Sequence, residues 1–351
     1  MRLFTAESVV EITKERKPDF IQIEQVLSCK RPDRPTLFEF YANDRVEQEI
    51  LTAAGVHSID PLERKLLFFR YAGYDYANIN ASDFTFHSNI RAKGESASYN
   101  SQGVITDRRS FEIYQWPDPE KYPLTALERS KELLPDGMKL MVCGPNGLLE
   151  NVIDLCGYET LCYMLYDDRG LVKDIFDAVG ARLLVYYQMA ADYEHVGILM
   201  DNDDWGFNTQ TMLSTNDMQE FVFPWHRKII EAAHVNNKKA VLHSCGQAAS
   251  IYEYIISDLK LDGKHSFEDT IEPVETAYEH LKGRIAVLGG IDVDFMSRKL
   301  PGEIYARARK ILNLTKQGGY ALGTGNSIPE YVPDENYYAL LHAALDYSSI
   351  Y

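Results

Sequence analysis

Long apolar runs are missing from this sequence of 351 residues. Nowhere do about 18 apolar residues follow one another, so the sequence predicts no membrane-spanning helix. The N-terminal stretch MRLFTAESVVEITKERKPDF carries charges every few positions and lacks the apolar core of a secretory signal. We therefore expect a cytoplasmic protein with no membrane among its partners.

Positive charge is also in short supply. The 36 Lys and Arg residues are outnumbered by 52 Asp and Glu residues, which gives a formal net charge of -16. A chain with this balance repels phosphate backbones and anionic lipid surfaces at long range. Nucleic acid is therefore not an expected partner.

Cysteines are few and odd in number. Five of them are spread irregularly over the chain, which argues against a disulfide framework and for reduced thiols. Cys143, Cys156 and Cys162 stand among Leu, Val, Met and Tyr, where a free cysteine is usually a small core residue. Cys245 differs because His243, another good metal ligand, stands two positions before it.

Nucleotide-binding signatures are absent as well. No predicted strand is followed by G-x-G-x-x-G, and there is no Walker motif. The chain does contain short β-rich runs that alternate with longer segments of helical periodicity, which is the pattern of parallel βα units. The predicted strands are LFEFY (37–41), KLMVCG (139–144), ILMDND (198–203), KAVLHSC (239–245), DGKHSF (262–267), RIAVLGG (284–290) and GYALGTG (319–325).

This alternation predicts an α/β protein, either a closed TIM (β/α)8 barrel or an open doubly wound sheet. We favour the barrel, because nothing points to the nucleotide site that often accompanies the open sheet. Residues 1–351 then form a single domain with an N-terminal extension. Residues from about 70 to 125 have poor periodicity and are predicted to be an inserted excursion near the active-site mouth. Tyr74 and Phe86 there could line an aromatic pocket or only pack the excursion onto the barrel.

Chemistry in a parallel barrel gathers at the C-terminal ends of the strands. Here those ends carry MDNDDWG, LHSCG, KHSFED, GGID and GTGN. Alternation places His243 and Cys245 on one face, about 6.5 Å apart, so that both can bind one cation. Nitrogen and sulfur ligands indicate zinc, with Glu268 after the next strand as a third ligand and one position open for a substrate. The alternative is that His243 and Cys245 are ordinary interior residues.

Other polar residues at these strand ends are candidates for catalysis or binding. Asp203 and Asp204 are predicted proton donors or substrate contacts, with helix capping and solvation as the alternative, and Trp205 beside them is a predicted substrate contact. His265 could support the metal, relay a proton or be a core histidine. Asn326 could bind the substrate or cap the next segment.

Six segments follow one another in an order that is typical of one superfamily. They are DNDDWGFNTQTML, FVFPWHRKIIEAAH, VLHSCG, DGKHSFEDTIEPVE, RIAVLGGIDVDF and GYALGTGNSIPEYVP, and the match covers roughly residues 135–345, with a weaker N-terminal match in KRPDRPTLFEFY. This series resembles the uroporphyrinogen decarboxylase superfamily. It is most similar to the branch of methyltransferases that act with corrinoid (cobalamin) proteins.

The resemblance implies a TIM barrel, a corrinoid protein as partner, and zinc held by His-x-Cys and by a later cysteine near the last strand. His243 and Cys245 match the pair, whereas Thr324 stands where the later cysteine is expected. The related cobalamin-independent methionine synthase has a glutamate ligand at an offset similar to that of Glu268. The decarboxylases of the superfamily make a homodimer compatible with the resemblance.

The function that we expect is zinc-dependent transfer of a methyl group from a small methyl donor to the Co(I) of a corrinoid protein. A carboxylate in place of a thiolate makes zinc a harder Lewis acid, which favours a methoxylated aromatic or another O-methyl compound as donor. One alternative is uroporphyrinogen decarboxylation, although the arginine motif of that branch is missing and only Arg31 and Arg34 stand nearby. Another is a non-catalytic barrel that binds a corrinoid or tetrapyrrole.

Overall fold

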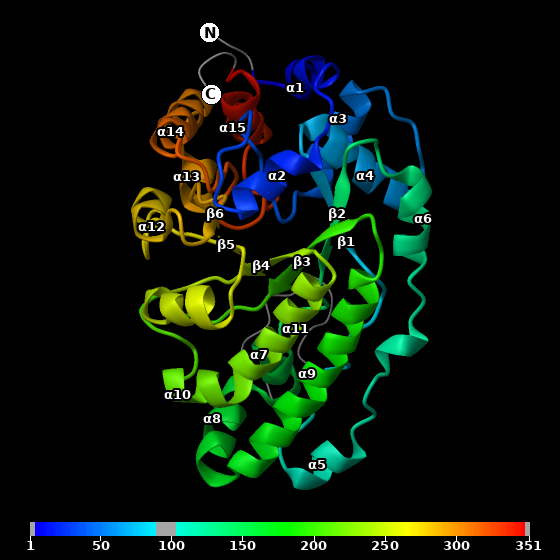
Figure 1. Cartoon of the computed structure of the whole chain (residues 1–351), viewed down its shortest axis with the longest axis vertical. Helices are drawn as coiled ribbons and strands as arrows, with labels where there is room; N and C mark the ends of the chain where they lie inside the picture. The colour runs from blue at the N-terminus through cyan, green and yellow to red at the C-terminus, as the bar shows by residue number, and fades with distance from the viewer. Residues whose placement is uncertain (1–3, 89–102, 348–351) are drawn as a thin grey trace.

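The computed structural model describes residues 4–88 and 103–347, in which one curled, parallel sheet stands at the centre (Figure 1). Each strand pairs with the next one in sequence order. The strands are β1 (Tyr76–Asn80), β2 (Lys139–Cys143), β3 (Val196–Asn202), β4 (Lys239–His243), β5 (Gly263–His265), β6 (Ala286–Leu288) and β7 (Tyr320–Ala321). This is the α/β architecture that the alternation of strands and helices predicts.

Helices connect the strands and cover the outside of the sheet. They are α1 (Ala6–Thr13), α2 (Phe20–Leu27), α3 (Asp44–Ala53), α4 (Pro61–Ala72), α5 (Arg108–Ile113), α6 (Thr125–Leu133), α7 (Leu148–Cys156), α8 (Tyr158–Asp167), α9 (Arg169–Ala191), α10 (Thr215–Asp217), α11 (Phe223–Val235), α12 (Val274–Leu281), α13 (Val293–Arg298), α14 (Pro301–Leu314) and α15 (Asp334–Leu345). Short 3-10 or π turns are η1 (Pro119–Lys121), η2 (Met218–Val222), η3 (Ala249–Ile251) and η4 (Tyr254–Asp258). Among the residues that the structure describes, none of the helices combines the length and apolarity that a membrane crossing requires.

Burial explains why the strands read as apolar runs rather than as alternating patterns. All seven residues of β3 are buried, as are the last four residues of β2 and of β4. Helices α9 and α11 contact β3 on one side, and the other side of the sheet faces the interior. A parallel strand covered on both faces loses the period-two signal, so its length and β-branched content mark it instead.

The eighth position of the predicted barrel is filled without a regular strand. The segment LFEFY lies beside β7, where the backbone N–H of Phe38 donates to the carbonyl of Leu322 over 2.8 Å. On its other side, β1 reaches the segment through side chains: the hydroxyl of Tyr76 donates to the carbonyl of Glu39, and Asn78 donates to the carbonyl of Phe40. The seven-stranded sheet therefore curls like part of a barrel, but no backbone ladder closes it in the described residues.

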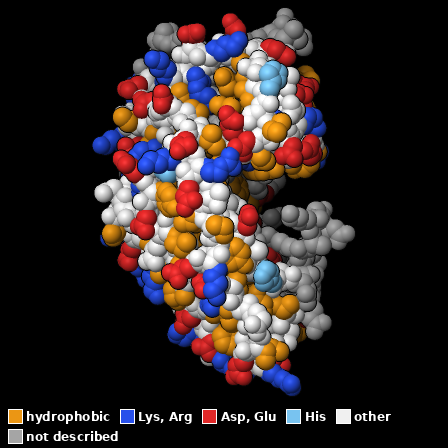
Figure 2. All heavy atoms as spheres, turned by 90° about the vertical axis from the view of Figure 1, so that its right-hand side faces the viewer, with side chains coloured by type: hydrophobic (Ala, Val, Ile, Leu, Met, Phe, Trp, Pro, Cys, Tyr) orange, Lys and Arg blue, Asp and Glu red, His pale blue; other side chains and the backbone are white. Residues whose placement is uncertain are grey.

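Strand β1 lies inside the region predicted to be an excursion. In its sequence YANIN two asparagines interrupt the apolar residues, so the sequence pattern did not predict a strand there. The first four residues of β1 are nevertheless buried. The part after β1 contains α5 and η1, and residues 89–102 lie outside the described ranges. From the side, the surface shows mixed charges and is hollowed at mid-height (Figure 2).

Candidate metal centre

Three neighbouring strands bring polar side chains together at their C-terminal ends. His243 is the last residue of β4, and its register partners are Asn202 on β3 and His265 on β5. Because partners across a parallel pair project to the same face, all three point into the interior of the curled sheet. The ring of Phe40 covers His243, with 4.7 Å between the ring centroids.

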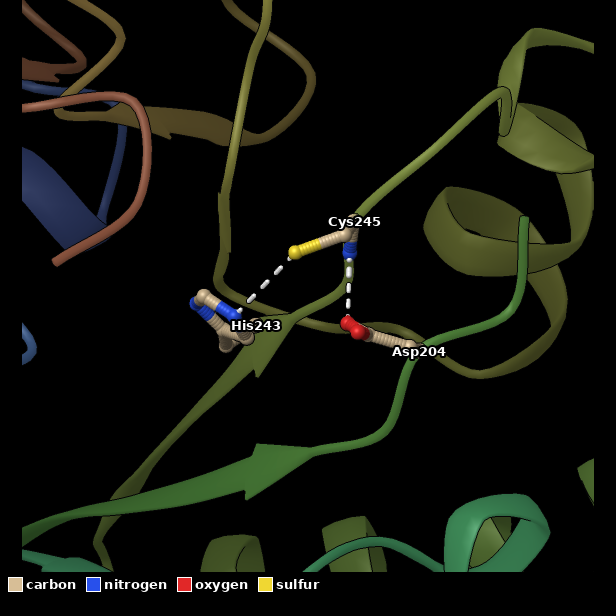
Figure 3. A group of neighbouring side chains, drawn as sticks. All are labelled: Asp204, His243 and Cys245. Carbon is tan, nitrogen blue, oxygen red and sulfur yellow. Dashed lines mark hydrogen bonds between the residues drawn. The ribbon is translucent and has the colours of Figure 1, made fainter. Parts of the chain in front are cut away.

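Asp204, His243 and Cys245 form a group that could hold a metal ion (Figure 3). One ligand atom from each lies within 4.8 Å of the others, and no other group of this kind is found in the described ranges. The sulfur of Cys245 is 3.6 Å from Nε2 of His243. The carboxylate of Asp204 accepts a 2.8 Å hydrogen bond from the backbone N–H of Cys245, which ties the loop after β3 to the loop after β4.

Two further side chains direct hydrogens at the sulfur of Cys245. The hydroxyl of Ser266 and the amide of Asn326 each donate to it over 3.3 Å. Burial, followed by the charge of Asp204, nevertheless raises the pKa of the Cys245 thiol far above its ordinary value. A cation at this position would favour the thiolate, because metal binding to cysteine displaces the proton.

A relay of hydrogen bonds fixes the tautomer of His243. Nε2 of His265 lies 3.1 Å from the carbonyl oxygen of Thr324, and since a carbonyl only accepts, this nitrogen carries the proton. Nδ1 of His265 must then accept from Nδ1 of His243, which is 2.8 Å away. The remaining nitrogen of His243, Nε2, keeps its lone pair and faces Cys245.

Both imidazoles of this relay are neutral. Burial, followed by the charge of Lys264, lowers the pKa of His243 to about 3. Burial and the neighbouring His243 hold the pKa of His265 well below its ordinary value. A neutral imidazole whose other nitrogen is hydrogen-bonded is the form in which histidine binds metals.

The donor set fits zinc. Imidazole nitrogen, thiolate sulfur and carboxylate oxygen are its usual ligands in proteins. Three such ligands leave a fourth position for a substrate or water, as in catalytic zinc sites. The residues that the sequence pairs by alternation, His243 and Cys245, are two members of the group.

The carboxylate that joins them is that of Asp204, whereas the sequence predicts Glu268. Ser266 adopts a left-handed backbone (φ 81°), which turns the chain just after β5. Glu268 then lies on the wall of a pocket of about 550 Å³ that Asn326 also lines. Burial, followed by the charges of Asp292 and Asp204, raises the pKa of Glu268.

Asp203 and Trp205 lie in the packing behind the metal group. The carboxylate of Asp203 accepts hydrogen bonds from the backbone N–H groups of Leu149 and Glu150, each at 3.0 Å, at the start of α7. It also accepts from the indole of Trp205 at 2.8 Å and bonds His226 at 2.9 Å. Both side chains are fully buried, and their hydrogen bonds join them to each other, to α7 and to His226.

The two aromatic candidates pack against other aromatic side chains. Tyr74 precedes β1, at the opposite end of the strands, and its hydroxyl bonds that of Tyr337 over 2.7 Å. Phe86 packs against Phe84 and Trp116, with ring centroids 5.2 and 6.4 Å apart. Both residues are buried, so packing accounts for what the structure shows of them.

Several residues near the site were not predicted from the sequence. Asn202 is 8% exposed, and its side-chain oxygen has no hydrogen-bond partner among the described residues. Lys264 is buried and donates to the carbonyls of Ser244 and Ser266, which supports the loops after β4 and β5. Its burial lowers the pKa of Lys264 to about 8. The register between β3 and β4 is the signal that finds Asn202, and spacing along the chain does not provide it.

Comparisons with known proteins identify the family and the fold. The family model described as uroporphyrinogen decarboxylase (URO-D) matches residues 97–347. A uroporphyrinogen decarboxylase from Anaeromyxobacter dehalogenans is 24% identical over 279 residues, which is 74% of either chain. A methyltransferase from Methanosarcina mazei has a similar fold, with a TM-score of 0.73, 15% identity and coverage of 95% of this chain and 100% of that one. The chain therefore belongs to the uroporphyrinogen decarboxylase (URO-D) family.

Proposed function

We propose that this protein is a zinc-dependent methyltransferase that moves a methyl group from a small methyl donor to the Co(I) of a separate corrinoid protein. The observation that carries the proposal is the convergence of Asp204, His243 and Cys245 at the strand ends. The likeness in fold to the Methanosarcina mazei methyltransferase supports it.

Asp204, His243 and Cys245 would hold the zinc ion. When bound, zinc supplies Lewis acidity to an oxygen of the substrate and so favours departure of that oxygen. One carboxylate and one thiolate make a harder site than several thiolates would, which suits an ether or phenolate oxygen. We therefore propose a methoxylated aromatic or another O-methyl compound as the donor.

The remaining residues would position the site and the donor. The proposed roles are orientation of His243 by His265, and of the Cys245 sulfur by Ser266 and Asn326. Asn326, which donates to the Cys245 sulfur, also lines the pocket of about 550 Å³, and this pocket has room for a small donor. In the transfer the carbon–oxygen bond breaks, Co(I) supplies the electron pair for the new cobalt–carbon bond, and the released oxygen takes a proton from solvent.

Uroporphyrinogen decarboxylation is the second candidate, since the relative from Anaeromyxobacter dehalogenans carries that name. A substrate with many carboxylates needs cations around it. Arg34 instead bonds Asp75 over 2.6 Å, just before β1 and at the far end of the strands. In the pocket that Asn326 lines, Arg298 pairs with Asp294, and acids outnumber bases: Glu268, Asp269, Asp292 and Asp294 face Arg298 and Lys299. These charges favour methyl transfer over decarboxylation.

The test begins with the metal content of the purified protein, for which we expect about one zinc per chain. Methyl transfer is then followed by the absorbance change of Co(I) corrinoid with a panel of methoxyarenes. His243→Ala and Cys245→Ala should lose the zinc and the transfer together, while His234→Ala, a surface control, keeps both. Full transfer by metal-free protein, or decarboxylation of uroporphyrinogen in its place, would overturn the proposal.

A further inference from the structure

The segment Phe38–Phe40 reaches the metal centre from outside the part of the chain that matches the URO-D family model, residues 97–347. Two of its rings cover the two imidazoles. The ring centroid of Phe40 is 4.7 Å from that of His243, and the centroid of Phe38 is 5.0 Å from that of His265. Phe38 is buried and Phe40 is partly buried, and their contacts limit how far the imidazoles can turn.

Glu39, between the two rings, is fully buried and contacts Thr324. The hydroxyl oxygen of Thr324 lies 2.9 and 3.0 Å from the two carboxyl oxygens of Glu39 and 3.2 Å from the carbonyl oxygen of Asn326. A hydroxyl has one proton, and the carbonyl of Asn326 can only accept. Both contacts are satisfied together when Thr324 donates to Asn326 and a protonated Glu39 donates to Thr324. Burial agrees with this, because it raises the pKa of Glu39 to about 8.

The loop that Glu39 holds touches both sides of the metal centre. The carbonyl of Thr324 accepts from His265, whose other nitrogen fixes the tautomer of His243. Two residues later, the amide of Asn326 donates to the sulfur of Cys245. One short loop therefore orients the imidazole ligand through His265 and the sulfur ligand directly.

We propose that Phe38–Phe40 is a positioning element of the metal centre, in which Glu39 acts through Thr324 to set the affinity with which His243 and Cys245 hold the metal. This inference rests on the proposed function, because it requires that the site binds zinc. It gives the segment that fills the eighth barrel position a role at the metal centre. Glu39 and Thr324 are positioning residues, since neither touches the metal group.

The experiment measures the Zn²⁺ affinity of the full chain by competition with a chromophoric chelator. Thr324→Val replaces only the hydroxyl by a methyl group and should weaken binding by about 10- to 100-fold, the range for lost support of metal ligands. Thr324→Ser keeps the hydroxyl and should bind as wild type does. Glu39→Leu should weaken binding like Thr324→Val, whereas Glu39→Gln, whose amide can donate to Thr324, should restore it.

A spectrum of the Co²⁺-substituted protein provides a second measurement. Thiolate-to-cobalt charge transfer reports the geometry at Cys245, so it should change in Thr324→Val and not in Thr324→Ser. If Thr324→Val does not fold, Phe40→Leu replaces it: the side chain stays apolar, the ring over His243 is lost, and weaker zinc binding is expected.

The outcomes separate this inference from the proposed function. Wild-type protein that binds no zinc would overturn both. Wild-type protein that binds zinc, together with Thr324→Val and Glu39→Leu variants of equal affinity and unchanged Co²⁺ spectrum, would overturn the positioning role and leave the proposed function standing.

Discussion

Two buried histidines, one beside the end of β3 and one at the end of β4, have opposite protonation states. His226, on α11, bonds Asp201 through one ring nitrogen and Asp203 through the other. His243, on β4, bonds only the neutral His265 through one nitrogen and turns the other toward Cys245. Burial opposes the charged form of both rings. At His226 the carboxylates overcome burial and raise the pKa to about 10, whereas at His243 the pKa falls to about 3.

The difference shows how the surroundings make the same side chain either a structural cation or a neutral base with a free lone pair. His226 uses both nitrogens as donors, so it has no lone pair for a metal. His243 receives no carboxylate, and its relay ends on the carbonyl of Thr324, which keeps one lone pair free. The two adjacent aspartates also differ in their partners. Asp203 caps α7 and bonds His226, while Asp204 lies in the metal group.

The largest effect on stability is expected from replacing His226. His226→Leu leaves the carboxylates of Asp201 and Asp203 buried beside each other without a cation, which should cost about 3–5 kcal/mol of unfolding free energy. His243→Gln keeps most of the side-chain volume and should cost less than about 1.5 kcal/mol, yet it should abolish zinc binding. Urea denaturation and metal analysis of both variants provide the measurements, and equal destabilisation by the two would contradict the comparison.

Raising the pH should remove the contribution of His226 to the free energy of unfolding. Its pKa is raised on folding from 6.5 to about 10, so the stabilisation is fully present below pH 6.5 and is lost as the pH rises through about 10. The loss is on the order of 5 kcal/mol. Glu39 adds a loss of folding stability at lower pH, because its pKa is raised on folding from 4.5 to about 8. The folded protein favours the protonated carboxyl group, so stability falls as the pH rises from 4.5 to about 8.

Unfolding free energies measured from pH 5 to pH 10 separate the two groups. His226→Leu should flatten the upper part of the curve, and Glu39→Gln should flatten the part below pH 8. A wild-type curve that rises over this whole range would contradict both assignments.

A smaller effect is expected at the adjacent aspartates. Asp203→Asn removes an acceptor from the first turn of α7 and weakens the contact with His226, which should cost about 1–3 kcal/mol and leave zinc binding largely intact. Asp204→Asn should instead weaken zinc binding with little change in the unfolding midpoint. Parallel denaturation and chelator-competition experiments test this division, and a stability loss in Asp204→Asn larger than that in Asp203→Asn would reverse it.

The smallest effect is expected at a histidine on the surface. His234 bonds Asp262 over 2.8 Å, but its side chain is 37% exposed. Water screens the pair, so His234→Ala should change the unfolding free energy by less than about 1 kcal/mol. A loss comparable to that of His226→Leu would show that burial is not what separates these histidine–carboxylate pairs.

Sequence patterns located most of the sheet. Six predicted strands overlap β2 to β7, because buried parallel strands are short apolar runs between helical segments, although β3 begins two residues earlier than predicted. The resemblance to the URO-D superfamily is confirmed by the family match. The prediction did not find β1, since YANIN carries two polar residues. It also did not show that LFEFY would fill the eighth barrel position without forming a regular strand.

At the site, alternation along one strand was enough to pair His243 with Cys245, because both residues belong to a single segment and local geometry sets their separation. The third partner depended on other strands. Asp204 reaches the group through the register between β3 and β4, while the left-handed turn at Ser266 leads Glu268 to the pocket wall. No spacing within one segment contains that information.

The sequence by itself therefore determined the kind of fold, the family and the pairing of His243 with Cys245, since these follow from local periodicity and from an ordered series of motifs. Only the tertiary structure decided which acid lies beside His243 and Cys245, which histidine is charged, and that Glu39 contacts a residue 285 positions away. The physical reason is that protonation and ligation depend on the surroundings of each buried group, and a curled sheet assembles those surroundings from distant segments.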